Sequence, residues 1–288
     1  KDGCTSDFGM IHDMRIAAVV CRCPVGKVAH NLERTCHWTR QAKQTGADLV
    51  CFPEMNLTGY SNRRTIAQYA IRTEGPEIDR LVRLAAEQHI ALLVGFAEMR
   101  RDGGLYASHM VITPNGRKGV YRKLHLAPPE IDQFSPGRQL PVFQWSGMRF
   151  GIQLCYDAHF PEIATRMAEA GVDTIFIPHA SPRGHARGKH QSWMRHLPAR
   201  AFDNGLFVIA CNQTGDNGSG LVFPGNAVAF SPSGEIMATH LTGRSGILVV
   251  DLVVAQLDHV RSHRMRYFFP NRRPGLYRRG LRLTPLDD

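Results

Sequence analysis

The stretch GIQLCYDAHFPE, residues 151–162, places a cysteine between the signals of a strand and those of a helix. The apolar side chains of Phe150 and Leu154 predict a strand that ends at Cys155, and a helical pattern begins at about Phe160. Ligands tend to bind at the carboxyl ends of strands in α/β proteins. Because the positive end of the helix dipole would face the thiol and lower its pKa, we expect Cys155 to act as a thiolate nucleophile.

A nucleophilic cysteine also needs a base and a group that stabilises the oxyanion, since a lone cysteine is more often an inert buried residue. Glu54 follows the apolar run DLVCFPE and is a candidate base, although a carboxylate in a loop is often only solvated. Lys123 follows a strand-like run in GVYRKLHLAPPE, which Glu130 closes. A lysine there is usually a surface charge, so neither residue alone predicts catalysis.

The elements that must position these residues alternate between strand and helix patterns. Two hairpins interrupt the alternation, about the turn residues 114–116 and 232–234. Each half of the chain therefore holds strand–helix units and one hairpin, which predicts an α/β fold with two facing sheets and helices outside them. The expected strands are 14–20, 47–54, 91–98, 149–155, 173–180 and 206–213, and the expected helices are 25–46, 77–90, 160–171 and 190–205.

The 288 residues are 43% hydrophobic, which is enough for one large domain, and we place it at residues 12–258. The net charge of +10 is concentrated in residues 259–288, which contain eight arginines and only two acidic residues. Nucleic-acid binding is one interpretation of such a segment. Since no known nucleic-acid motif accompanies the charge, we favour an Arg-rich C-terminal arm that packs on the domain or at a subunit interface.

Seven cysteines are scattered along the chain without a CxxC pair, so a zinc site is not expected. The triplet Cys21-Arg22-Cys23 lies in an apolar strand-like segment, which favours free thiols over a metal site. Free thiols are typical of a reducing cytoplasm. No apolar run reaches the roughly 18 residues that span a bilayer, and the first residues lack the apolar core of a signal peptide, so a soluble cytoplasmic protein is expected.

Three motifs in chain order resemble those of the carbon–nitrogen hydrolases of the nitrilase superfamily. These enzymes carry a glutamate in an FPE strand end, a lysine in a YRK-H segment and a cysteine in a CYD–FPE elbow. The matching residues here are Glu54, Lys123 and Cys155. Glu130 matches a second glutamate that often follows the lysine. The resemblance extends over about residues 14–277 and includes the stretches ARAFDNGLFVIACNQ and RRPGLY.

The resemblance implies a four-layer α-β-β-α sandwich, a homodimer or larger homo-oligomer, and no metal or organic cofactor. It implies that Cys155 attacks an amide-type carbon while Glu54 accepts the thiol proton, and that water activated by Glu54 later hydrolyses the thioester. Lys123 and the backbone N–H of Tyr156 would hold the oxyanion, and Glu130 would orient Lys123 and the substrate. One carboxylate would thus move the proton while a permanent cation stabilises negative charge.

The residues that follow Cys155 bear on the branch of the family. Nitrilases commonly continue with Trp-Glu, whereas Tyr156-Asp157 resembles the amidase and N-carbamoyl amidohydrolase branches. Carbamoyl-D-amino-acid hydrolases carry two arginines shortly after that aspartate, where this chain has Ala158 and His159, which argues against the same substrate. A carbamoylputrescine-type enzyme or a short-chain amidase stays open, and nitrile hydrolysis is the alternative reaction.

The loop of residues 178–193 follows a strand end and should border the pocket. It contains Arg183 and Arg187 among several basic residues and no acid, which predicts either an anionic group on the substrate or a solvated basic loop. Further candidates for substrate contact are Tyr60, His159 and His179. A non-catalytic binding protein that uses its basic tail is a third possible function, which the intact catalytic set disfavours. The sequence does not identify the substrate side chain or the oligomer size.

Overall fold

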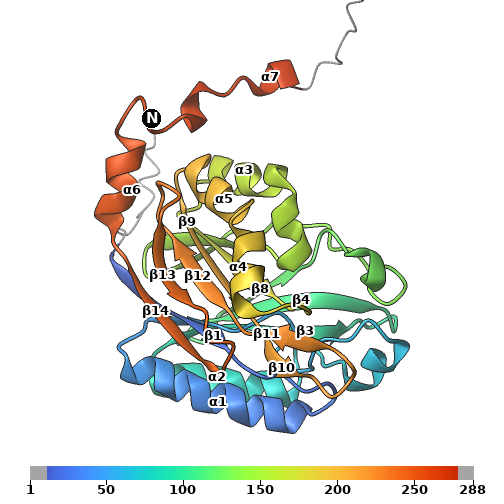
Figure 1. Cartoon of the computed structure of the whole chain (residues 1–288). Helices are drawn as coiled ribbons and strands as arrows, with labels where there is room; N and C mark the ends of the chain where they lie inside the picture. Colours follow the sequence, from blue (N-terminus) through green and yellow to red (C-terminus); the bar gives the residue numbers. More distant parts are fainter. Residues whose placement is uncertain (1–11, 278–288) are drawn as a thin grey trace, which may run out of the picture.

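The computed structural model describes residues 12–277 of the chain (Figure 1). Two six-stranded sheets face each other, and helices cover the outer face of each sheet. The four-layer sandwich expected from the sequence is therefore confirmed. A small third sheet pairs β10 (Thr214–Asp216) with β11 (Val222–Pro224).

The first sheet has the strand order β14-β1-β2-β3-β4-β5. Its strands β1, β2 and β3 are parallel, and β4 and β5 form the first predicted hairpin. The crossover helices α1 (Val28–Gln44) and α2 (Pro76–Gln88) cover its outer face. The strand bounds are β1 (Met14–Val20), β2 (Leu49–Cys51), β3 (Ala91–Met99), β4 (Leu105–Ile112), β5 (Lys118–Arg122) and β14 (Gly246–Leu252).

The second sheet repeats this plan in the order β13-β12-β9-β8-β7-β6. Its strands β7, β8 and β9 are parallel, and β12 and β13 form the second hairpin. The helices α3, α4 and α5 cover it from above in Figure 1. The strand bounds are β6 (Phe143–Trp145), β7 (Met148–Ile152), β8 (Thr174–His179), β9 (Phe207–Asn212), β12 (Ala227–Phe230) and β13 (Ile236–His240).

The helix expected at residues 160–171 is α3 (Pro161–Glu169), and a single turn of 3-10 geometry, Cys155–His159, precedes it. One expected helical segment differs from the structure. The expected helix 190–205 is two helices, α4 (Ala186–Trp193) and α5 (Leu197–Phe202). The break is explained by Pro198 in the first turn of α5, because proline lacks the N–H that a continuous helix needs.

Strand periodicity explains why the layers form. Along β1, Ile16 and Ala18 pack into the core between the sheets, whereas Ala17 and Val19 pack against the helices of the first outer layer. Phe150 and Ile152 of β7 reach the same central core from the second sheet. Both sheets are thus buried on both faces, which the continuous apolar runs of their parallel strands require.

The C-terminal segment leaves the sandwich through α6 (Val254–Arg261), which spans the expected boundary after residue 258. The Arg261 guanidinium donates to Asp173 Oδ1 at 2.6 Å and to the carbonyl oxygens of Val172 and Gly205. The 3-10 turn Phe269–Asn271 and α7 (Pro274–Tyr277) follow and extend away from the sandwich (Figure 1). Residues 278–288 of the predicted arm lie outside the described residues, so the division into domain and arm stays a prediction. Within residues 12–277, no helix is long and apolar enough to cross a membrane.

Candidate active site

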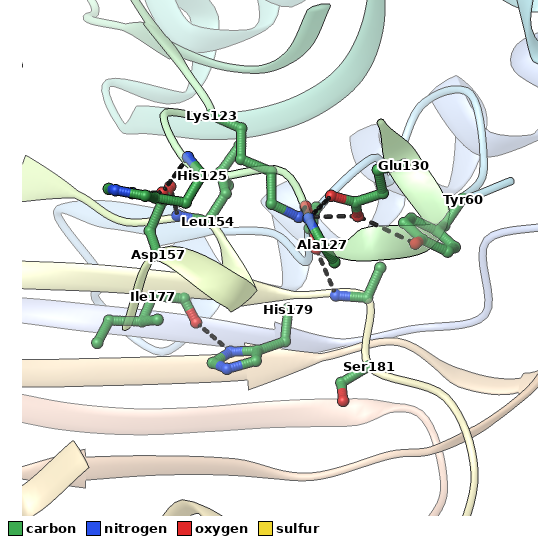
Figure 2. Close-up of polar contacts among 12 residues, drawn as sticks. Tyr60, Lys123, His125, Ala127, Glu130, Leu154, Asp157, Ile177, His179 and Ser181 are labelled. Carbon is green, nitrogen blue, oxygen red and sulfur yellow. Dashed lines mark hydrogen bonds and ion pairs between the residues drawn. The ribbon is translucent and has the colours of Figure 1, made fainter. Parts of the chain in front are cut away.

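The predicted catalytic residues come from three strand ends on both sheets. Glu54 follows β2 and Lys123 follows β5 in the first sheet, and Cys155 follows β7 in the second. Hydrogen bonds connect residues from the two sheets in this region, and Figure 2 draws part of this network. The next strand of the second sheet, β8, adds the backbone N–H of Ala180, which donates to Glu54 Oε2 at 2.9 Å.

Lys123 lies between two buried carboxylates. Its Nζ atom is 2.8 Å from Glu54 Oε1 and 2.8 Å from Glu130 Oε1, and all three side chains are at most 3% exposed. Figure 2 shows Lys123 beside Glu130. Burial by itself would lower the pKa of Lys123, but the two carboxylates outweigh burial and hold this pKa well above its usual value. Lys123 is therefore a permanently charged ammonium, as an oxyanion stabiliser must be.

Glu130 is held from several sides. Its Oε1 accepts from the Tyr60 hydroxyl at 3.0 Å, and its Oε2 accepts from the backbone N–H of Ala127 at 2.8 Å. These bonds come in addition to the ion pair with Lys123, so Glu130 has little freedom to change its orientation. Tyr60, which the sequence indicated for substrate contact, lies against Glu130, and its hydroxyl fixes this carboxylate.

Glu54 is anchored through its backbone as well as its side chain. Gln213 Nε2 donates to the Glu54 carbonyl oxygen at 2.8 Å. Gly95 of β3 packs directly against the backbone of Glu54 and Met55, and a Cβ atom at Gly95 would lie 2.5 Å from the backbone nitrogen of Met55. Burial raises the pKa of the Glu54 carboxyl to about 7, although the Lys123 ammonium pulls it down. A carboxyl with a pKa near neutrality is well suited to accept and return a proton.

Cys155 occupies a strained backbone position, with φ of 46° in the left-handed region that non-glycine residues rarely adopt. The expectation of a lowered thiol pKa is wrong. Burial and the Glu54 carboxylate raise the pKa of Cys155 well above its usual value, and the Lys123 ammonium offsets only part of this. The helix α3 begins at Pro161, six residues after Cys155. Its dipole acts on the thiol only weakly, because the effect of a helix terminus falls off within about one turn. The resting thiol is therefore protonated.

Asp157 has a structural role that sequence reasoning missed. Its Oδ2 accepts from the Tyr121 hydroxyl at 2.7 Å and from the Leu154 N–H at 3.1 Å, and its Oδ1 accepts from the His125 N–H at 2.8 Å. The carboxylate is completely buried. It therefore ties the turn of Cys155 to β5 and to the segment after Lys123. Asp157 is the third residue of the turn Cys155–His159, and an acidic residue at this position can accept from the backbone N–H that precedes the turn.

The residues predicted to contact substrate differ in their burial. His179 is buried, its Nδ1 lies 2.7 Å from the Ile177 carbonyl oxygen, and its ring packs on Trp193, which supports a structural role. His159 is exposed, and its ring packs against those of Tyr156 and His196. Arg183 and Arg187 are also exposed. The side chains of Arg183 and Arg187 make no hydrogen bond or ion pair with the rest of residues 12–277, and their contact with substrate stays a prediction.

Metal ligation was not expected, and the described part of the chain contains no group of three or more histidine, cysteine, aspartate or glutamate residues that could hold a metal ion. The polar groups around Cys155 are instead already paired with one another. This arrangement can deliver a proton acceptor, a fixed cation and a thiol to one small molecule.

Similarity to known proteins agrees with this chemistry. The profile of the carbon–nitrogen hydrolase family matches residues 15–262. An (R)-stereoselective amidase from a Pseudomonas species is 32% identical over 82% of this chain and 84% of its own length. A probable nitrilase from Schizosaccharomyces pombe is 30% identical over 92% of this chain and 97% of its own length.

Solved structures extend the comparison to the fold. An amidase from Nesterenkonia sp. superposes with a TM-score of 0.80 at 28% identity, covering 95% of this chain and 99% of its own. A mutant of the Nesterenkonia sp. AN1 amidase, with a TM-score of 0.80, 27% identity and coverage of 94% of this chain and 98% of its own, holds the acetamide moiety of fluoroacetamide covalently on its active-site cysteine. The chain belongs to the carbon–nitrogen hydrolase family of the nitrilase superfamily. It is a cysteine-dependent hydrolase of amide C–N bonds.

Proposed function

We propose that this enzyme hydrolyses a small non-peptide amide through a thioester on Cys155, with Glu54 as the proton carrier and Lys123 as the oxyanion stabiliser. The observation that carries the proposal is the pair of 2.8 Å contacts that hold the Lys123 ammonium between two buried carboxylates. A surface lysine would have no reason to be desolvated in this way. The strained backbone of Cys155 at the adjoining strand end supports the nucleophile assignment.

In the first half-reaction the Cys155 sulfur attacks the carbonyl carbon, and Glu54 accepts the thiol proton. The raised pKa of the thiol makes this transfer part of the attack, because little thiolate exists beforehand. Negative charge then develops on the carbonyl oxygen. The Lys123 ammonium and the backbone N–H of Tyr156 stabilise it, since the first N–H groups of a helical turn have no partner within that turn.

The tetrahedral intermediate collapses when the C–N bond breaks and protonated Glu54 transfers its proton to the departing nitrogen. Ammonia or an amine leaves, and the acyl group stays on Cys155 as a thioester. Water then attacks the thioester carbon while Glu54 takes one of its protons. The C–S bond breaks, the thiol regains a proton from Glu54, and the carboxylic acid is released. Glu130 holds Lys123 in place through both half-reactions.

The test is ammonia release from a panel that contains neutral amides, N-carbamoyl amines and nitriles of matched size. We expect the amides to be the best substrates, and prior alkylation of Cys155 to abolish their turnover. Cys155→Ala is the matched control, because it removes only the sulfur. Amide hydrolysis at a normal rate by this variant contradicts the proposal, and a clear preference for nitriles or N-carbamoyl compounds assigns the enzyme to another reaction of the same family.

We also propose that the enzyme is a homodimer or larger homo-oligomer in the cytoplasm. Support for a reducing compartment comes from the cysteines, because the six within residues 12–277 are all free thiols. Light scattering coupled to size-exclusion chromatography measures the assembly. A monomer at micromolar concentration would contradict the first part of this proposal.

A further inference from the structure

Within the basic loop of residues 178–193, Lys189 has a side chain that is fixed next to the residues that hold the catalytic base. It lies in α4, and its Nζ atom is 2.7 Å from Ser181 Oγ and 3.2 Å from the Pro182 carbonyl oxygen. Ser181 directly follows Ala180, the residue whose N–H donates to Glu54. The Lys189 ammonium is therefore fixed to the strand end that also holds the catalytic base.

This ammonium has no carboxylate partner within the described residues, where the ion pairs involve other cations. A lysine ammonium has three N–H donors. Ser181 Oγ and the Pro182 carbonyl oxygen accept two of these hydrogen bonds. Both acceptors are neutral, so one N–H donor has no protein acceptor and no opposite charge balances the ammonium. The side chain is half-buried, and burying a charge without an opposite charge is unfavourable.

The electrostatic surroundings of Lys189 point to the reaction centre. Burial lowers the pKa of Lys189, and a negative charge on the Cys155 sulfur would raise it. Arg183 and Arg187 belong to the same basic loop but are exposed, so solvent screens their charges.

We propose that Lys189 binds a carboxylate on the substrate, so that the preferred substrates are small amides that carry a carboxylate a few bonds from the scissile C–N bond. This inference rests on the proposed amide hydrolysis. The unused N–H donor of Lys189 forms a charge-assisted hydrogen bond with the substrate carboxylate, while the amide carbon lies against Cys155. An ammonium at the same position of the substrate is repelled by Lys189.

The experiment compares three amides of similar shape: succinamate, its neutral analogue levulinamide, and the cationic γ-aminobutyramide. We expect the wild-type enzyme to prefer succinamate in kcat/KM. Lys189→Met should lower the ratio of kcat/KM for succinamate to that for levulinamide by roughly 10- to 100-fold, the range of one hydrogen bond to a charged group. Because the bond forms away from the reacting atoms, the loss should appear mainly in KM for succinamate rather than in kcat.

Lys189→Arg keeps the charge and should keep most of the preference for succinamate. Lys189→Glu should shift the preference to γ-aminobutyramide. Arg183→Met and Arg187→Met remove exposed charges of the same loop and serve as matched controls, with ratios within about twofold of wild type. Equal loss in these controls would show a general effect of loop charge and overturn the assignment to Lys189.

Two failures can be told apart. If levulinamide and succinamate are both hydrolysed but Lys189→Met leaves their ratio unchanged, the role of Lys189 is rejected and the amidase assignment stands. If no amide of the three is hydrolysed, or if Cys155→Ala hydrolyses them at the wild-type rate, the proposed function fails and the role of Lys189 fails with it. Thermal unfolding of each variant identifies one that has lost its fold, and Lys189→Gln then replaces Lys189→Met.

Discussion

The Tyr121 hydroxyl donates a 2.7 Å hydrogen bond to Asp157 Oδ2, and both side chains are completely buried. Tyr121 belongs to β5, which ends immediately before Lys123, and Asp157 belongs to the turn of Cys155. The two residues come from opposite sheets. This one hydrogen bond therefore helps to set the position of the oxyanion-stabilising cation relative to the nucleophile.

Tyr121→Phe should reduce the free energy of unfolding by about 1 kcal/mol, the usual net value of one hydrogen bond. Asp157→Ala should cost more, about 2–4 kcal/mol, because it leaves the buried donors of Tyr121, His125 and Leu154 without an acceptor. Urea unfolding measures both values. If Asp157→Ala is no less stable than Tyr121→Phe, the carboxylate does not organise this turn.

Cys155→Ala should abolish turnover and leave the fold intact, because a smaller side chain at a partly exposed position removes few packing contacts. Mass spectrometry of the wild-type enzyme during turnover should detect an acyl adduct on a peptide that contains Cys155. An adduct on another of the described cysteines would reject this nucleophile. The other five are buried and serve as internal controls.

Glu54→Gln and Lys123→Met should each lower kcat/KM by roughly 10²- to 10⁴-fold, since each removes a single proton-transfer or oxyanion-stabilising group. Lys123→Met should also destabilise the fold, because it leaves Glu54 and Glu130 buried without their shared cation. Steady-state kinetics and thermal unfolding of both variants test this. A near-normal rate in either variant would remove that residue from the mechanism.

The rate should depend on pH through Glu54, which works as a base only when it is ionised. Its pKa is raised to about 7, so the ionised fraction falls as the pH drops through 7. We expect kcat/KM to fall about tenfold per pH unit on the acid side of that value. A profile that stays flat down to about pH 5 would contradict a raised pKa.

Gly95→Ala should impair catalysis from a distance. The added Cβ would lie 2.5 Å from the backbone nitrogen of Met55 and 2.8 Å from His109 Nδ1, so the segment that carries Glu54 must shift. We expect a loss in kcat on the order of 10-fold to 100-fold, because misplacing a catalytic group by about 1 Å is costly. Gly275→Ala, whose Cβ meets nothing within 4 Å, is the control. Unchanged kinetics in Gly95→Ala would show that the Glu54 segment tolerates displacement.

Part of this protein could be predicted from the sequence because the relevant physics is local. Short apolar runs such as that of β1 and amphipathic helices such as α2 identify their elements without knowledge of their partners. Glu54, Lys123 and Cys155 were candidates because each follows a strand-like run. Their chain order resembled a known family, and the family and fold were confirmed.

The tertiary structure decided the properties that depend on burial and on distant partners. The sequence predicted an acidic thiol from a neighbouring helix, but burial beside Glu54 raises the pKa of Cys155 instead. Likewise, no local pattern distinguishes Lys189 from Arg183 and Arg187, since all three are cations in one loop. Residue types and their spacing identify which groups could react, but solvent exclusion and contacts between the two sheets determine their charge state and which of them reach the site.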